Sequence, residues 1–204
     1  MDLAAALARA RLLSAGPGRT ILGIAGPPGS GKSTLASLLC AEAGAACALV
    51  PMDGFHLADT VLEALGLRDR KGAPETFDSF GYAALLGRLR RGDDPVVYAP
   101  AFERDLEQPI AGAIAVPAAV RLVVTEGNYL LCAGAGWPAA RQQLDEVWYC
   151  ELADDVRLAR LVDRHVRFGK PRAAAAAWVD SVDQPNARLV GATRRLADHI
   201  VNVP

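Results

Sequence analysis

The sequence predicts an α/β fold in which a parallel sheet carries helices on both faces. Short apolar segments alternate with helical segments along the chain, and this alternation is typical of right-handed crossovers between parallel strands. The expected strands are residues 21–25, 47–52, 121–125, 146–152 and about 199–203. The expected helices are residues 2–14, about 32–42, 57–65, 79–91, about 154–168, 171–182 and 186–197.

The segment 95–118 is predicted to form loops and short extended pieces. We expect no helix there because the segment contains Pro95, Pro100, Pro109 and Pro117. The rest of the chain shows no repeat, low-complexity tail or linker between domains. We therefore expect a single domain over residues 1–204.

The bulk composition is typical of one globular domain. The chain has 204 residues, of which 51% are hydrophobic and 22% are charged. A net charge of −1 gives no general attraction to nucleic acid or to an anionic membrane, so we expect neither as a partner, and any positive potential must be local. No run of 18 apolar residues exists, and residues 1–11 lack the basic start of a signal peptide. We expect a cytoplasmic location and leave a homo-oligomer open.

The cysteines form no C-x-x-C pair and stand in apolar surroundings. They are Cys40, Cys47, Cys132 and Cys150. This pattern is typical of small buried hydrophobic residues in a reducing compartment. We expect unpaired cysteines and no metal site built from them.

The motif with the clearest chemistry lies between the first strand and its helix. Residues 26–34 match G-x-x-x-x-G-K-[ST], with Gly26, Gly31, Lys32 and Ser33 at the fixed positions. In such a loop, glycines let backbone N–H groups surround phosphate oxygens, and the helix N-terminus adds partial positive charge. Lys32 can reach the β- and γ-phosphates, and the Ser33 hydroxyl can bind Mg²⁺. The complete motif favours a nucleoside triphosphate site over a turn that only caps a helix.

Acidic side chains stand at or near the ends of predicted strands. Ligands of parallel sheets bind at the carboxyl ends of strands, where a carboxylate can bind Mg²⁺ or act as a base. Asp53 follows the second strand, and its alternative role is to cap a helix. Glu126 is followed by Gly127, and because glutamate caps poorly, a functional role is favoured there. We interpret Glu151, in the next strand, as structural.

Several stretches follow one another in an order typical of one family. They read Gly-Pro-Pro-Gly-Ser-Gly-Lys-Ser-Thr at 26–34, Met-Asp-Gly-Phe-His at 52–56, Gly-Leu-Arg-Asp-Arg-Lys-Gly-Ala-Pro-Glu-Thr-Phe-Asp at 66–78 and Thr-Glu-Gly-Asn-Tyr-Leu-Leu at 125–131. Together they resemble the phosphoribulokinase/uridine kinase/pantothenate kinase group of P-loop small-molecule kinases. The resemblance implies a P-loop NTPase fold with a helical lid. It also implies ATP-dependent phosphotransfer to a hydroxyl of a nucleoside, sugar or pantothenate-like acceptor.

The resemblance implies roles for the loop and for the strand-end carboxylates. Asp53 would orient or deprotonate the acceptor hydroxyl, whereas Ser33 and Glu126 would organise Mg²⁺. An exchange of roles between Asp53 and Glu126 stays open. The residues expected to hold ATP are Gly26, Pro27, Pro28, Gly29, Ser30, Gly31, Lys32, Ser33, Thr34 and, from the lid, Lys170.

On the acceptor side, the resemblance points to several polar residues. Asp78 matches an acidic residue that holds acceptor hydroxyls in the group, and it could also cap the helix 79–91. Arg104 is implied as an acceptor or phosphate contact, and Tyr98 either joins it or packs. No Asp follows Tyr98 as it does in uridine kinases, which disfavours uridine as the acceptor. His56 could line the same site.

The predicted helix 154–168 and its exit are rich in basic residues. Their spacing alone is typical of a solvated face, and they are Arg157, Arg160, Arg164, Arg167 and Lys170. The resemblance instead implies a lid over about residues 157–172. In that lid Arg164 and Lys170 would close on the phosphates, with Arg167 as an alternative. Closure would stabilise the transferring phosphoryl group and exclude water.

Other proteins that share the phosphate-binding loop are the alternatives to this interpretation. An NTPase switch is disfavoured because the chain lacks the N-K-x-D element that reads guanine. In addition, the strand most similar to a Walker B strand ends in Glu126 and lacks the usual Asp. A nucleoside monophosphate kinase would need more cations at the acceptor phosphate, whereas the predicted site is rich in carboxylates. We therefore predict a kinase with an alcohol group as acceptor and leave the identity of the acceptor open.

Overall fold

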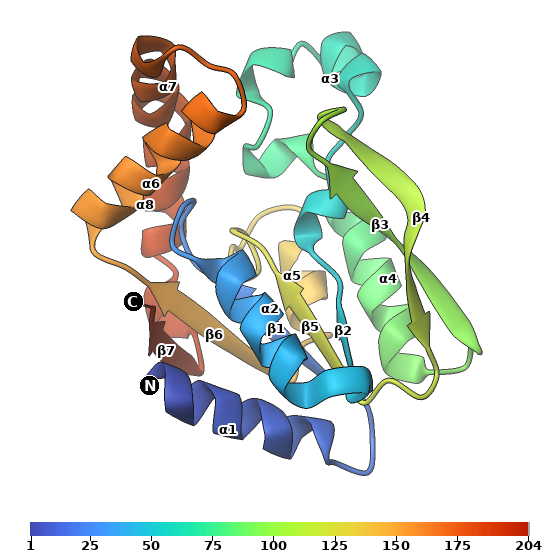
Figure 1. The fold of residues 1–204 in the computed structure, drawn as a ribbon. Helices are drawn as coiled ribbons and strands as arrows, with labels where there is room; N and C mark the ends of the chain where they lie inside the picture. Colours follow the sequence, from blue (N-terminus) through green and yellow to red (C-terminus); the bar gives the residue numbers. More distant parts are fainter. Residues whose placement is uncertain (204) are drawn as a thin grey trace.

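A five-stranded parallel sheet forms the centre of the molecule, which a computed structural model describes over residues 1–203 (Figure 1). The strands lie in the order β2-β5-β1-β6-β7, and every neighbouring pair is parallel. Their bounds are β1 (Thr20–Ala25), β2 (Cys47–Leu49), β5 (Leu122–Glu126), β6 (Glu146–Glu151) and β7 (His199–Asn202). The predicted fold class is confirmed.

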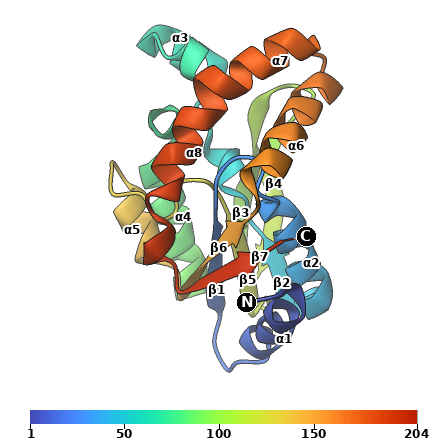
Figure 2. The ribbon, with the colours of Figure 1, turned by 90° about the vertical axis from the view of Figure 1, so that its left-hand side faces the viewer.

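Helices cover both faces of the sheet (Figure 1, Figure 2). Because side chains alternate along a strand, Leu22 and Ile24 of β1 pack against one face and Ile21 against the other. The first face is covered by α1 (Leu3–Ser14) and α2 (Lys32–Ala43), and the second by α4 (Ser79–Arg91) and α5 (Trp137–Arg141). Beyond the carboxyl ends of the strands lie α3 (Asp59–Leu65), α6 (Asp154–Arg167) and α7 (Arg172–Trp178), and α8 (Gln184–Gly191) leads back to β7.

The register of the sheet determines where the site can form. Ile24 of β1 is the register partner of Glu126 of β5, and the Gly127 N–H donates to the Ile24 carbonyl at 3.0 Å. Since β1 ends at Ala25, the phosphate loop begins directly beside Glu126. The two motifs are 93 residues apart in sequence and adjacent at the edge of the sheet.

The segment 95–118, predicted to form loops and short extended pieces without a helix, is a long β-hairpin. β3 (Val96–Glu103) and β4 (Gln108–Pro117) pair antiparallel in a separate two-stranded sheet. In a two-stranded ribbon every strand has a free edge, so prolines are tolerated there. Pro100 lies at the register shift between Ala99 and Ala101, where the ladder is already interrupted. The exclusion of a helix is confirmed, but the long continuous strands were missed, because prolines were treated as strand breakers and the sequence does not show that the pair is isolated.

The helices near the C-terminus form a continuous rod where the sequence predicted two separate ones. The last residue of α7 leads into one π turn, η5 (Val179–Asp183), and this leads directly into α8. Pro185 has no N–H to donate, and it stands in the first turn of α8, directly after the wider π turn. A π turn also changes the direction in which the following side chains point, and Asn186 of α8 lines the cavity at the carboxyl ends of the strands.

The cysteine prediction was wrong for one pair. Cys40 near the end of α2 and Cys47 at the start of β2 form a disulfide, with their Cα atoms 5.2 Å apart. The short 3₁₀ turn 44–46 folds the chain back and brings them together. Cys132 and Cys150 are free and buried, as expected. Within residues 1–203, no helix is both long and apolar enough to cross a membrane.

Candidate active site

The phosphate loop has the conformation that its glycines permit. Gly26 and Gly29 have φ values of 152° and 81°, in the region that favours glycine. A Cβ atom on Gly26 would lie 2.7 Å from the carbonyl oxygen of Cys150, so the loop packs against the end of β6 without room for a side chain. Lys32 curls over the loop, and its Nζ donates to the Pro27 carbonyl at 3.0 Å. Burial lowers the pKa of Lys32.

Ser33 and Glu126 meet beside this loop. The Ser33 hydroxyl donates to Glu126 Oε1 at 2.8 Å, from the first turn of α2 to the last residue of β5. Burial raises the pKa of Glu126, the charge of Asp53 raises it further, and Lys32 lowers it. A hydroxyl and a carboxylate are the hard oxygen ligands that Mg²⁺ takes when phosphates complete its shell. The donor set therefore fits Mg²⁺.

Asp53 lies on a 3₁₀ turn that begins where the predicted strand was expected to continue. β2 ends at Leu49, and η2 (Met52–Phe55) carries the carboxylate toward the loop. The next residue, Gly54, packs so closely on the hairpin that a Cβ atom would lie 2.3 Å from the Pro100 carbonyl oxygen. This contact sets the hairpin beside Asp53, where Arg104 Nη2 lies 3.5 Å from Asp53 Oδ2.

His56 follows on the same turn and is held by aromatic rings. Its ring centroid lies 4.0 Å from that of Phe77 and 4.6 Å from that of Phe102. Its Nδ1 lies 2.8 Å from the backbone oxygen of Asp53. Burial lowers the pKa of His56, although the neighbouring Asp53 opposes this. His56 is therefore suited to hydrogen bonding as a neutral ring.

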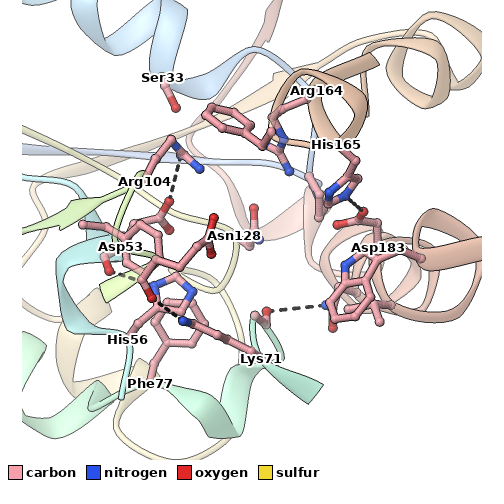
Figure 3. Close-up of a pocket in the computed structure, with 18 of the residues that line it drawn as sticks. Ser33, Asp53, His56, Lys71, Phe77, Arg104, Asn128, Arg164, His165 and Asp183 are labelled. Atoms are coloured by element: carbon pink, nitrogen blue, oxygen red, sulfur yellow. Dashed lines mark hydrogen bonds and ion pairs between the residues drawn. The ribbon is translucent and has the colours of Figure 1, made fainter. Parts of the chain in front are cut away.

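These residues line a cavity of about 390 Å³ under the lid (Figure 3). Its lining includes Lys32, Ser33, Asp53, His56, Arg104 and Glu126, all of them predicted site residues. The expectation of a carboxylate-rich site was wrong, because the basic side chains in the lining outnumber the acidic ones. The basic ones are Lys32, Arg68, Lys71, Arg104, Arg164 and Lys170, and the acidic ones are Asp53, Glu107, Glu126 and Asp183.

Two predicted acceptor residues do not face this cavity. The Asp78 carboxylate accepts from the Gly81 N–H at 2.8 Å and caps α4, which was its alternative role. Tyr98 is exposed on the outer side of β3. Neither residue belongs to the lining of the cavity. We therefore leave both out of the proposals below.

The cavity also contains residues that the sequence interpretation missed. Lys71 is nearly buried, and its Nζ donates to Asp59 Oδ1 at 2.7 Å and lies 5.4 Å from the Phe102 ring centroid. Asn128 follows the strand-end motif of β5. Asp183, Asn186 and Trp178 come from the C-terminal rod. Lys71 lies in the stretch 66–78 and Asn128 in the stretch 125–131, and both stretches carried the resemblance without a role for these residues.

The lid region carries its basic residues in different surroundings. Arg164 lines the cavity together with Lys170, whose Nζ lies 4.7 Å from the Trp178 ring centroid. His165 Nε2 lies 2.8 Å from Asp183 Oδ2 and joins α6 to the π turn. Arg157, in contrast, is 1% exposed, so a solvated basic face does not describe this position.

A second cavity, of about 550 Å³, lies on the other side of the phosphate loop. Its lining comes from the loop, α1, α2, α6 and the chain after β7, and includes Leu3, Gly29, Gly31, Thr34, Leu38, Arg160, Arg167 and Val203. Lys32, Ser33 and Arg164 line both cavities. The phosphate loop thus separates two compartments, and the same cations face both.

The fold and this loop define the class of P-loop kinases, and comparisons with known proteins agree. No protein-family model matches the chain. The chain is 34% identical over 190 residues to the uncharacterized protein YggC of Escherichia coli, covering 91% of this chain and 78% of that protein. It is 32% identical over 160 residues to "Putative uridine kinase C227.14" of Schizosaccharomyces pombe, covering 74% of this chain and 68% of that protein.

A solved structure is similar over the whole chain. The "putative fructose transport system kinase" of Silicibacter sp. TM1040 has a TM-score of 0.87 and 40% identity, with 100% of both chains covered. The chain belongs to the P-loop small-molecule kinases of the phosphoribulokinase/uridine kinase/pantothenate kinase group. It is an ATP-dependent phosphotransferase with an alcohol group as acceptor.

Proposed function

We propose that this kinase transfers the γ-phosphoryl group of MgATP to a hydroxyl of a sugar-sized acceptor bound in the cavity under the lid. The observation that carries the proposal is the position of the phosphate loop between two cavities, with Asp53 on the wall of only one of them. A donor nucleotide on one side and an acceptor on the other would meet at Lys32 and Ser33. In-line transfer needs such an arrangement.

The nucleotide would occupy the loop and the second cavity. The N-terminus of α2 and the loop amides favour the phosphates, and Lys32 would exchange its contact with the Pro27 carbonyl for phosphate oxygens. Arg164 and Lys170 would add positive charge from the lid. Because phosphoryl transfer depends mostly on positioning and charge stabilisation, these groups account for most of the expected catalysis.

Ser33 and Glu126 would hold Mg²⁺ together with the phosphates. The contact between their side chains orients both oxygens toward one place, and binding the ion would replace it. Mg²⁺ bound there would neutralise charge on the phosphate oxygens. Burial and the charge of Asp53 raise the pKa of Glu126, and a divalent ion bound there would favour its ionised form.

Asp53 would accept the proton of the acceptor hydroxyl. Its carboxylate lies on the acceptor wall, and Arg104 Nη2, 3.5 Å away, holds its orientation. The hydroxyl oxygen would then form the new P–O bond, while the bond to the β,γ-bridging oxygen breaks and ADP leaves. Glu126, which would hold Mg²⁺ together with Ser33, is less available for this role.

The composition of the cavity wall supports a compact polyhydroxyl acceptor. Its lining includes the hydrogen-bonding side chains of Asp53, His56, Asn128, Asp183 and Asn186 beside the basic ones, and its volume of about 390 Å³ suits a molecule of monosaccharide size. The solved structure with 40% identity over the full length is described as a "putative fructose transport system kinase", which supports the same class. A ketose or related polyol is therefore our first candidate acceptor.

We further propose that the kinase works in the cytoplasm on this small molecule, without nucleic acid or membrane as a partner. The net charge of −1 supports this proposal, and ATP is abundant in that compartment. Association into a homo-oligomer is a separate proposal, which the molecular mass in solution would test.

The experiment that tests the function is a screen of acceptors with the purified protein. ADP release is measured with MgATP and each of a set of ketoses, aldoses, nucleosides and pantothenate, and the product is identified by mass spectrometry. We expect one class to raise ADP release by orders of magnitude and to gain one phosphoryl group. The same class must be inactive with the Asp53→Asn variant. Stimulation that survives this substitution would overturn the assignment of the acceptor site.

A further inference from the structure

Arg157 is buried at the junction of the phosphate loop and the C-terminal rod. Only 1% of the residue is exposed, although it belongs to the first turn of the predicted lid helix. Its Nη1 donates to the Pro28 carbonyl at 3.3 Å, and its Nη2 donates to Gln184 Oε1 at 2.6 Å. Its Nε donates to Asp154 Oδ1 at 2.9 Å, on the exposed side of the helix.

The contact with Pro28 fixes a particular peptide unit of the loop. Pro27 and Pro28 have no amide hydrogen, so after Gly26 the first N–H that the loop can offer to a phosphate is that of Gly29. This N–H belongs to the same trans peptide as the Pro28 carbonyl and points the opposite way. A carbonyl bound by Arg157 therefore directs the Gly29 N–H away from α6. A cationic donor also polarises the peptide and strengthens its N–H as a donor.

The packing around Gly29 shows how tightly α6 holds the loop. A Cβ atom on Gly29 would lie 2.7 Å from Leu161 Cγ and 3.2 Å from Arg157 Cγ. The loop thus rests directly on the first two turns of α6. Because Arg157 contacts the Pro28–Gly29 peptide directly, a movement of this peptide would displace the Arg157 side chain.

The hydrogen bond from Arg157 to Gln184 links the phosphate loop to the wall of the acceptor cavity. Gln184 opens α8 directly after the π turn, next to Asp183, which lines the acceptor cavity and pairs with His165. Asn186, two residues further, also lines the cavity, and its Nδ2 lies 3.5 Å from the Gly72 carbonyl. One guanidinium group therefore joins a phosphate-binding peptide to the helix start that forms the acceptor wall.

We propose that Arg157 is a positioning residue that couples the two compartments, so that a nucleotide on the loop orders the acceptor wall at 179–186. This proposal rests on one part of the proposed function, the binding of a nucleotide to the phosphate loop. Binding of phosphate to the Gly29 N–H would stabilise the peptide orientation that Arg157 recognises. The same guanidinium then holds Gln184 and, with it, Asp183 and Asn186. By thermodynamic linkage, an ordered acceptor wall would in turn favour nucleotide binding.

The test is hydrogen exchange of the segment 179–191 with and without MgADP, combined with calorimetry of MgADP binding. In the wild-type protein, MgADP should slow exchange of this segment several-fold. Gln184→Met removes the hydrogen bond to Arg157 and keeps the side-chain size. This variant should bind MgADP within about tenfold of the wild-type affinity, but MgADP should not slow its hydrogen exchange in 179–191. Gln184→Glu keeps an acceptor for Arg157 and should retain the slowing.

Two further variants separate this role from general stability. Asp154→Asn changes the exposed partner of Arg157 and should behave as the wild type. Arg157→Met should lose the slowing and also weaken MgADP binding, because the Gly29 peptide is no longer held. If MgADP slows hydrogen exchange in Gln184→Met as much as in the wild type, the inference is overturned and the proposed function is not affected. A wild-type protein that binds no MgADP would overturn the proposed function and the inference with it.

Discussion

Arg104 Nη2 and Asp53 Oδ2 lie 3.5 Å apart on the wall of the acceptor cavity, although 51 residues separate them in the sequence. The hairpin supplies the arginine and a 3₁₀ turn after β2 supplies the carboxylate. The same arginine lies 5.9 Å from the ring centroid of Phe168, at the C-terminal end of the lid helix. Arg104 therefore touches both the proposed base and the lid that would close over it.

The first prediction concerns Asp53. Asp53→Asn keeps the size of the side chain but removes the proton acceptor, and loss of a general base typically costs about 10²–10⁴-fold. We expect kcat to fall by that much, with the KM for ATP close to that of the wild type. Steady-state kinetics with the acceptor found by screening provide the measurement. Asp105→Asn, at an exposed position on the same hairpin, is the matched control.

The second prediction concerns Glu126 and pH. Burial and Asp53 raise the pKa of Glu126, so protons should compete with Mg²⁺ at higher pH than at an ordinary glutamate. The Mg²⁺ concentration for half-maximal activity should therefore rise as the pH falls toward this raised pKa. In Glu126→Gln it should be high at every pH. If Glu126→Gln instead removes turnover at saturating Mg²⁺ while Asp53→Asn shifts only the metal dependence, the two roles are exchanged.

The third prediction concerns Lys32. Its buried ammonium donates to the Pro27 carbonyl of the same loop, so its removal should leave the sheet and the core intact. Lys32→Ala should abolish phosphoryl transfer, with an unchanged circular dichroism spectrum and a melting temperature near that of the wild type. Arg88→Ala, at an exposed pair with Asp94, serves as the control. Turnover near the wild-type rate in Lys32→Ala would contradict the nucleotide site.

The fourth prediction concerns the lid cations. Arg164 and Lys170 line the acceptor cavity, so Arg164→Ala and Lys170→Ala should lower acceptor-stimulated ADP release by about 10²–10³-fold. Arg172→Ala removes an exposed cation that pairs with Asp163 and should have little effect. ADP release is measured with and without the acceptor. Equal loss in all three variants would indicate damage to the helices and not loss of phosphate contacts.

Local signals in the sequence predicted part of this structure well. The helix expected over 79–91 was found as Ser79–Arg91, because its ends have their own chemistry: Asp78 caps the N-terminus, and Gly92 ends the helix with a φ of 69°. The phosphate loop was equally clear. The same local logic predicted loops and short extended pieces where the long hairpin lies, since isolated pairing is a property of the tertiary structure.

The acceptor site was less predictable because distant segments form it. His165 of α6 and Asp183 of the π turn are 18 residues apart, and their side chains meet across the junction between the lid helix and the rod. Arg157 was indistinguishable in sequence from the basic residues around it, although it is the one that is buried. Periodicity gives the face of a helix, but it does not show what packs against that face.

The central claim is transfer to an alcohol, and the fate of the γ-phosphoryl group tests it most directly. ³¹P NMR of a reaction with MgATP and the acceptor from the screen measures phosphoester and inorganic phosphate together. We expect almost all of the phosphoryl group in the phosphoester, and little inorganic phosphate when the acceptor is absent. Rapid formation of inorganic phosphate without an acceptor, at a rate that Asp53→Asn leaves unchanged, would contradict the account and identify an NTPase.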